Sequence, residues 1–236
     1  MRSQHIVGAF DAELQGLSRR IAAMGGMAER MVEEAATALR RGDLGLAEQV
    51  IAADERLDAA QRELDEMVVS MLARRQPIAG DLREVIAALR IGADLERVGD
   101  LAKSVAKRIG AVDAGERPRE LQSGLDALAE AAQSQLKDVL DAYATRTVDR
   151  LEPMRDRDRE IDTVFTSLFG SLLEGMMEEP RTITASTHLL FCIKNFERIG
   201  DHATNIAETV FQMVTGREMP ANRPKADRTH SLSGAA

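Results

Sequence analysis

This 236-residue sequence is poor in aromatic residues and nearly free of cysteine. Tryptophan is absent, one tyrosine is present, and aromatic residues make up 3% of the chain against 44% hydrophobic residues. A β-sheet protein would draw more on aromatic and β-branched residues, so this composition favours helices. The single cysteine, Cys192, excludes an internal disulfide and fits a reducing compartment.

The chain also lacks long apolar runs and an excess of positive charge. No stretch approaches the roughly 20 apolar residues that a transmembrane helix needs. The N-terminus reaches Asp11 and Glu13 before any apolar run long enough for a signal peptide. The net charge of −8 repels nucleic acid and anionic lipid. We therefore expect a cytoplasmic protein that neither binds nucleic acid nor inserts directly into a membrane.

What the sequence does contain is heptad spacing of apolar residues, which is typical of helical bundles. Six such runs are present, at residues 14–38, 50–71, 88–109, 125–143, 161–172 and 189–210. Asp43 and Asp81 are predicted to cap the second and third helices. Helices joined by short turns run antiparallel. The sequence therefore predicts an all-α fold of two tandem antiparallel three-helix bundles. More than about 75% of the chain should be helical, against roughly one-third in an average globular protein.

The apolar pattern and the loop composition also suggest the domain boundaries. They predict a first three-helix repeat at 1–110, a linker at 111–118, a second repeat at 119–215 and a polar, disordered tail at 216–236. The core seam of the second helix is predicted to run through Val50, Ala53 and Leu57. That of the fifth is predicted to run through Ile161, Val164 and Leu168.

The two halves share a charged motif as well as apolar spacing. LERVGDLAKSVA begins at Leu95 and FERIGDHATNIA begins at Phe196; DERLD at 54–58 matches DREID at 158–162 more loosely. Shared periodicity alone would align only apolar residues, so the agreement of the polar ERxGD indicates a true duplication. The symmetry fails at two nearby places. Asp94 faces Asn195 and Leu101 faces His202, which offers a nitrogen ligand in the second repeat only.

The repeated motifs place carboxylates four residues apart, on one face of a helix. The pairs are Asp54/Asp58 with Glu96/Asp100, and Asp158/Asp162 with Glu197/Asp201. Two pairs on adjacent helices repel unless a cation or a guanidinium neutralises them. Placed on the heptad, Glu96 and Asp100 lie away from the seam, so we expect solvent-accessible clusters. The alternative is an ordinary solvated face, with i,i+3 ion pairs to Arg97 and Arg198. Gly99 and Gly200 cost helix propensity, which predicts the close approach of a neighbouring helix or a ligand.

These features resemble the PhoU family of phosphate-uptake regulators, over about residues 5 to 215. The resemblance rests on the two ERxGD copies and the preceding D-x-x-[LI]-D. It implies a non-enzymatic regulator that represses phosphate-starvation signalling by linking the ATPase of a phosphate ABC transporter to a sensor histidine kinase. It further implies iron or zinc on the eight carboxylates named above, no organic cofactor, and a homodimer. Arg97 and Arg198 flank the acids and are the candidate partner-binding residues.

Two other readings of the residues remain. A helical-bundle di-metal carboxylate protein would need Glu-x-x-His motifs with inward-facing ligands, and none of the four histidines has a glutamate three residues before it. A plain coiled-coil adaptor explains the heptads but leaves the duplicated ERxGD unexplained. A glycine-rich phosphate loop is absent, which argues against nucleotide hydrolysis. Oxygen ligands alone do not identify a metal.

Overall fold

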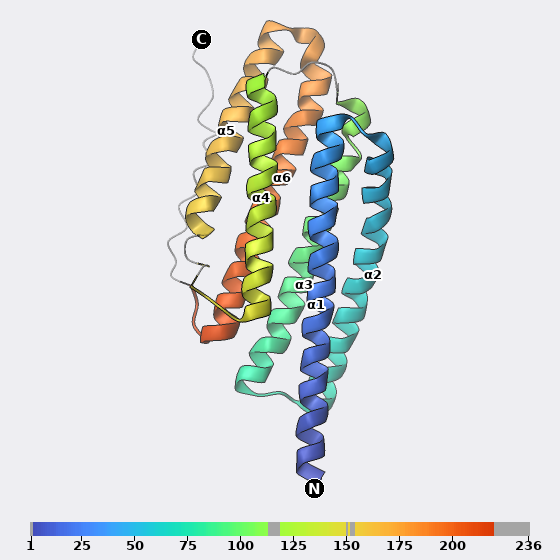
Figure 1. Ribbon diagram of the computed structural model, residues 1–236, viewed down its shortest axis with the longest axis vertical. Helices are drawn as coiled ribbons and strands as arrows, with labels where there is room; N and C mark the ends of the chain where they lie inside the picture. Colours follow the sequence, from blue (N-terminus) through green and yellow to red (C-terminus); the bar gives the residue numbers. More distant parts are fainter. Residues whose placement is uncertain (1, 113–118, 150, 152–153, 220–236) are drawn as a thin grey trace.

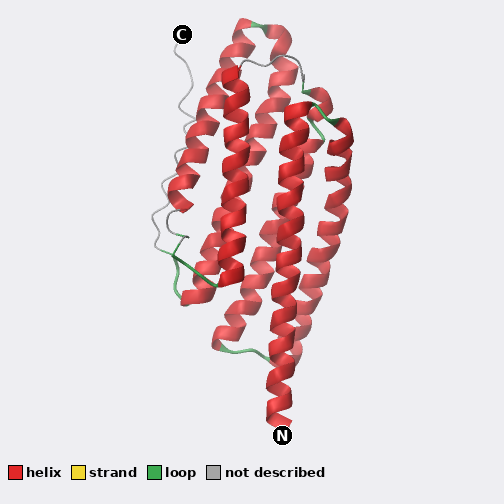
Figure 2. Cartoon of the chain, in the orientation of Figure 1, coloured by secondary structure: helices red, strands yellow, loops and turns green. Residues whose placement is uncertain are grey.

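The computed structural model describes residues 2–112, 119–149, 151 and 154–219, and there helices are joined by short turns and loops (Figures 1 and 2). Helices make up 91% of these residues, and none of them is in a strand, which confirms the all-α prediction. The elements are α1 (Arg2–Arg41), α2 (Leu44–Arg75), α3 (Ala79–Ala106), η1 (Ile109–Ala111), α4 (Arg119–Thr145), α5 (Met154–Glu178), η2 (Pro180–Thr182) and α6 (Ile183–Thr215). Most of the predicted linker and of the predicted tail lie outside the described residues.

The helix boundaries follow local chemistry. Leu46 N–H donates to Asp43 Oδ1 at 2.9 Å, so Asp43 caps α2 as predicted. Asp81 does not cap α3. It lies in the first turn, and Ile78 occupies the cap position without a side-chain hydrogen bond. The rigid φ of Pro77 and the extended Ile78 start this helix one turn earlier than the polar residue suggested.

The six helices form two antiparallel three-helix bundles that lie side by side. In Figure 1, α1 runs up, α2 down and α3 up, whereas α4 runs down, α5 up and α6 down. The second bundle is therefore inverted relative to the first. The bundles meet where α3 packs against α6 and α1 packs against α4. Each ERxGD helix is thus central, in contact with its own bundle on one side and with the other bundle on another.

The glycines of the two motifs allow α2 to approach α3 closely, and α5 to approach α6. A Cβ at Gly99 would clash with Leu57 Cδ2, and a Cβ at Gly200 would lie 2.9 Å from Ile161 Cδ1. Leu57 is fully buried, so it has no free space to move into. The predicted close approach of a neighbouring helix is confirmed at both glycines.

Within the described residues, none of the helices combines the length and the apolar character that crossing a bilayer requires.

Candidate functional site

An aspartate occupies a core position on α2, and another does so on α5. Asp54 is 4% exposed and Asp158 is 5% exposed, each between buried apolar residues of its own helix. Ala53 and Val164, which the predicted seams include, are only partly buried, and Asp54 and Phe165 take the buried places beside them. Buried positions on α2 include residues 50, 54 and 57, and those on α5 include residues 154, 158, 161 and 165. The steps of three and four residues between them also fit a heptad pattern. A search for apolar residues at heptad spacing passes over a carboxylate in a seam position. Charged side chains are rarely buried without a partner, so each of these aspartates needs one.

In the first repeat, the partner of the buried aspartate is a lysine on α3. Lys103 Nζ donates to Asp54 Oδ2 and, at 2.8 Å, to Asp100 Oδ1. Its side chain is 21% exposed, so the ammonium is partly enclosed between α2 and α3. Desolvation would lower the pKa of Lys103, but hydrogen bonds to Asp100 and Asp54 outweigh it and raise the pKa above its ordinary value. The ammonium links two of the four carboxylates predicted to bind metal.

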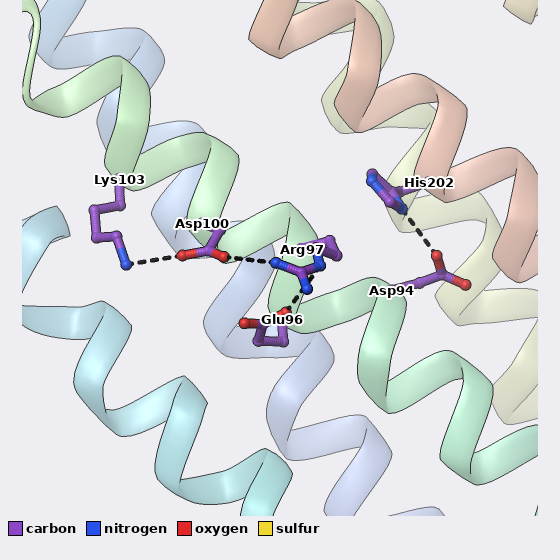
Figure 3. Close-up of polar contacts among 6 residues, drawn as sticks. All are labelled: Asp94, Glu96, Arg97, Asp100, Lys103 and His202. Carbon is purple, nitrogen blue, oxygen red and sulfur yellow. Dashed lines mark hydrogen bonds and ion pairs between the residues drawn. The ribbon is translucent and has the colours of Figure 1, made fainter.

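The remaining charges of the first repeat form a chain along α3 (Figure 3). Arg97 donates to Asp100 Oδ2 at 3.2 Å and lies 3.5 Å from Glu96. Burial and the Asp100 carboxylate raise the pKa of Glu96, and Arg97 offsets part of this. Burial also favours a higher pKa for Asp100, but Lys103 and Arg97 outweigh it and lower the pKa of that carboxyl. The cluster thus contains its own cations.

In the second repeat, a threonine on α6 donates a hydrogen bond to the buried aspartate. Thr204 occupies the position equivalent to Lys103, and its hydroxyl lies 3.1 Å from Asp158 Oδ1. Gln135 Nε2 on α4 donates to the Thr204 hydroxyl at 2.7 Å. Gln135 is fully buried, and its Oε1 has no hydrogen-bond partner among the described residues. An amide oxygen without a hydrogen-bond partner among the described residues therefore lies in the core near Gly200. A Cβ built on Gly200 would be 3.4 Å from this oxygen.

Glu197 is the most deeply buried carboxylate of the second cluster, at 2% exposed. Lys194 Nζ lies 2.9 Å from Glu197 Oε2 and 4.6 Å from the centre of the Phe165 ring, so it forms an ion pair and a cation–π contact. Burial raises the pKa of Glu197, Lys194 offsets part of the effect, and the Asp201 and Asp162 carboxylates add to it.

The structure contradicts the prediction that both clusters lie open to solvent. The buried members are Asp54, Asp158, Asp162 and Glu197. The half-buried members are Asp58, Glu96, Asp100 and Asp201. The reason is that Asp54 and Asp158 occupy core positions within their own bundles, and the carboxylates of α3 and α6 lie on the sides of those helices that face α2 and α5. Arg97 and Arg198 are exposed, as their predicted role in docking requires.

The two departures from internal symmetry form a single contact. His202 Nδ1 on α6 lies 2.8 Å from Asp94 Oδ1 on α3, across the interface between the bundles (Figure 3). The residues equivalent to Asp94 and His202 in the other repeat are Asn195 and Leu101, and a leucine side chain cannot form this hydrogen bond. His202, which the sequence offered as a ligand for the second repeat, contacts a residue of the first.

The eight carboxylates do not form a preorganised metal centre. In the part of the chain that the structure describes, no group of three or more histidine, cysteine, aspartate or glutamate side chains is arranged to hold a metal ion. The donor chemistry differs between the repeats. Lys103 already lies between Asp54 and Asp100, whereas the neutral Thr204 stands in its place in the second repeat. The predicted metal ligands therefore stay a prediction.

Sequence reasoning missed Lys103, Thr204 and Gln135. One signal for the first was present, because Lys103 follows Asp100 by three residues, a spacing that places both on one helix face. No local signal marks Gln135, whose position opposite Thr204 depends on how α4 packs against α6.

Comparison with known proteins shows the family to which this chain belongs. Residues 21–109 and 125–210 match the PhoU domain, one match in each bundle. The chain belongs to the PhoU family. It is 54% identical to a phosphate-specific transport system accessory protein PhoU homolog of Rhizobium meliloti (strain 1021), over 98% of each chain. It is 44% identical to the protein of the same description in Caulobacter vibrioides (strain NA1000 / CB15N), over 95% of this chain and 98% of the relative.

Solved structures of PhoU proteins share the fold. The crystal structure of PhoU from Pseudomonas aeruginosa matches with a TM-score of 0.84 and 37% identity, over 88% of this chain and all of that one. The structure of the phosphate transport system regulatory protein PhoU from Streptococcus pneumoniae matches with a TM-score of 0.81 and 26% identity, over 89% and 99%. The pair of inverted bundles is therefore an architecture of the PhoU family.

Proposed function

We propose that this chain is a cytoplasmic, non-enzymatic accessory protein of phosphate transport that restrains phosphate uptake. In this proposal it links the ATPase of a phosphate ABC transporter to a sensor histidine kinase. The observation that carries it is the similarity over 98% of the chain to a phosphate-specific transport system accessory protein. Surface chemistry supports a docking role, since exposed Arg97 and Arg198 flank carboxylates in equivalent places of both repeats. Charged surfaces of this kind favour rapid, salt-dependent encounter with a partner.

Deletion of the gene is expected to derepress phosphate uptake and the starvation response in phosphate-rich medium. The physical reason is loss of the adaptor that carries the transporter's state to the kinase. Phosphate uptake and a starvation-promoter reporter measure the effect. A deletion strain with normal regulation, in a genome without a second copy of the gene, would show the proposal to be wrong.

Complementation of this strain locates the docking surface. An Arg97→Glu, Arg198→Glu double variant should fail to restore repression, whereas Arg30→Glu, an exposed reversal on α1, should restore it. Both arginines of the test variant are exposed, so their ion pairs contribute at most about 1 kcal/mol and the fold should survive. Repression by the test variant would place the docking surface elsewhere and leave the function standing. The predicted homodimer also belongs to this proposal, and light scattering on the purified protein tests it.

Metal binding is a second part of the proposal, and we assign it first to the second repeat. The residues that would hold an iron, zinc or other divalent cation there are Asp158, Asp162, Glu197 and Asp201. Gln135 Oε1, which has no hydrogen-bond partner among the described residues, is a further oxygen donor in the same network, because Gln135 Nε2 donates to Thr204 and Thr204 donates to Asp158. A bound cation would neutralise part of the negative charge around Glu197, whose pKa is raised by burial and by the nearby Asp201 and Asp162 carboxylates. Thr204, a neutral residue, stands at the position equivalent to Lys103.

Glu197→Gln is therefore expected to remove more metal than Glu96→Gln from protein purified without chelator. The two substitutions are matched, since they remove one carboxylate charge at equivalent positions. Elemental analysis of wild type, both single variants and the double variant measures the content per chain. Equal metal in wild type and the double variant would exclude these glutamates as ligands. A larger loss from Glu96→Gln would reverse the assignment to the second repeat.

A further inference from the structure

A small pocket between the bundles is lined by two arginines and by no carboxylate. It lies where the N-terminal part of α3 meets the C-terminal part of α6, before Glu96 on α3 and after Asp201 on α6. Its volume is about 220 Å³. The polar groups that line it are Arg83, Arg90, Thr209 and Gln212, and four apolar side chains complete the wall.

The guanidinium groups have the placement expected of anion ligands. Arg83 and Arg90 are seven residues apart on α3, which puts them on the same helix face. Both arginines are exposed, and Arg90 Nη1 donates to Gln212 Oε1 at 3.0 Å across the bundle interface. Arg83 reaches the end of α6, where its Cζ would lie 3.4 Å from a Cβ built on Gly216. Within the described residues, neither arginine forms an ion pair with a carboxylate.

This pocket does not arise from the duplication. The residues equivalent to Arg83 and Arg90 in the second repeat are Thr184 and Phe191. There the Arg108 guanidinium lies 4.8 Å from the centre of the Phe191 ring. One end of the α3–α6 interface therefore carries an aromatic ring covered by a guanidinium, whereas the other carries two guanidinium groups around a pocket.

We propose that this pocket binds a phosphate-sized oxyanion, with inorganic phosphate as its ligand. Two guanidinium groups offer several N–H donors to a tetrahedral oxyanion, and Thr209 and Gln212 add neutral polar side chains to the lining. The pocket is smaller than the roughly 300 to 1,000 Å³ of sites for organic ligands, which favours a free ion over a nucleotide. The net charge of −8 works against nonspecific attraction of anions, so affinity would have to come from the pocket itself.

A simpler role accounts for only part of the arrangement. Arginine near the end of a helix stabilises its last carbonyl groups, which explains Arg83 beside the end of α6. It does not explain Arg90, which is further along α3 and held by a side-chain amide. The proposal that this pocket binds an anion is argued from geometry alone. A regulatory effect of the bound anion would, in addition, depend on the proposed function.

Calorimetric titration of the full chain with inorganic phosphate, in buffer free of phosphate and sulfate, tests the pocket. Arg90→Gln and Arg83→Gln should each weaken binding by about tenfold or more, because each removes charge-assisted hydrogen bonds. Gln212→Glu should abolish binding, since it places a carboxylate beside Arg90 and keeps the size of the side chain. Arg56→Gln, an exposed neutralisation on α2, is the matched control and should bind as wild type does.

The outcomes separate this proposal from its alternatives. Equal phosphate binding by wild type and Gln212→Glu, or none by wild type at millimolar phosphate, would overturn it. Arg83→Gln with lower thermal stability and unchanged phosphate affinity would reduce that residue to a helix cap and also overturn it. Tighter binding of AMP than of phosphate would overturn the assignment to the free ion. Each readout is independent of the deletion phenotype, so failure here leaves the proposed regulatory function untouched.

Discussion

Replacement of Lys103 by methionine is expected to lower the free energy of unfolding by about 2 to 3 kcal/mol at neutral pH. The substitution keeps the length of the side chain but removes the ammonium between Asp54 and Asp100. Asp54 would then remain in the core without its charged partner. The loss of one partner of a buried pair costs about 3 to 5 kcal/mol, and the partial exposure of Lys103 and Asp100 reduces this value.

Arg97→Met is the control for this substitution. Arg97 also contacts Asp100, but its side chain is 61% exposed, so its removal should change stability by no more than about 1 kcal/mol. Urea denaturation followed by circular dichroism measures both variants. Similar losses in the two would mean that enclosure of the Lys103 ammonium contributes nothing beyond a surface ion pair.

The Lys103→Met effect should also depend on pH in a definite direction. Lys103 and Arg97 lower the pKa of Asp100 in the folded protein despite its partial burial. A carboxyl with a lowered folded pKa stabilises the protein above its unfolded pKa, and that stabilisation is lost as pH falls through the folded pKa. The gap between wild type and variant should therefore narrow below about pH 4. A gap that widens on acidification would contradict this assignment.

Replacement of Glu197 by glutamine is expected to have the opposite sign, an increase in stability of about 1 to 2 kcal/mol at neutral pH in the presence of chelator. Glutamine keeps the shape of the side chain and avoids a charge in a site that is 2% exposed. Lys194 loses its ion pair, but its side chain is 42% exposed and water can solvate it. The cost of the buried charge therefore outweighs the ion pair.

The direction of the pH effect follows from burial. Burial raises the folded pKa of Glu197 above its unfolded value, so the folded state binds more protons between the two values. The free energy of unfolding of the wild type therefore falls as pH rises through this interval. The Glu197→Gln variant has no carboxyl to ionise there, so its free energy of unfolding does not fall for this reason. The difference between the two should vanish below about pH 4 and be complete above the folded pKa. Denaturation curves from pH 4 to 8 measure it.

Glu96→Gln provides the comparison within the same chain. Glu96 occupies the equivalent place in the first repeat and its pKa is also raised, but its side chain is 18% exposed against 2% for Glu197. Its gain in stability should be the smaller of the two. Equal gains would show that burial does not set the difference. Destabilisation by Glu197→Gln would show that Lys194 more than offsets the buried charge.

Local chemistry in the sequence was sufficient for the elements and their duplication. Heptad spacing identified six helices, Asp43 identified one cap, and ERxGD identified a repeated unit with helices close together at Gly99 and Gly200. These features depend on residues within a few turns of one another, so periodicity and propensity are enough to reveal them.

Only the tertiary structure decided which surfaces those helices cover. Periodicity tells which side of a helix is apolar but not which neighbour packs there, so the inverted pairing of α3 with α6 was not predicted. That pairing joins Asp94 to His202 and brings together the residues that line the pocket beside Arg83 and Arg90. Asp54 in a core seam is stable only because Lys103, 49 residues away, reaches it from another helix. The sequence by itself determined the elements and their repeat, whereas burial and charge pairing depend on contacts between residues distant in the chain.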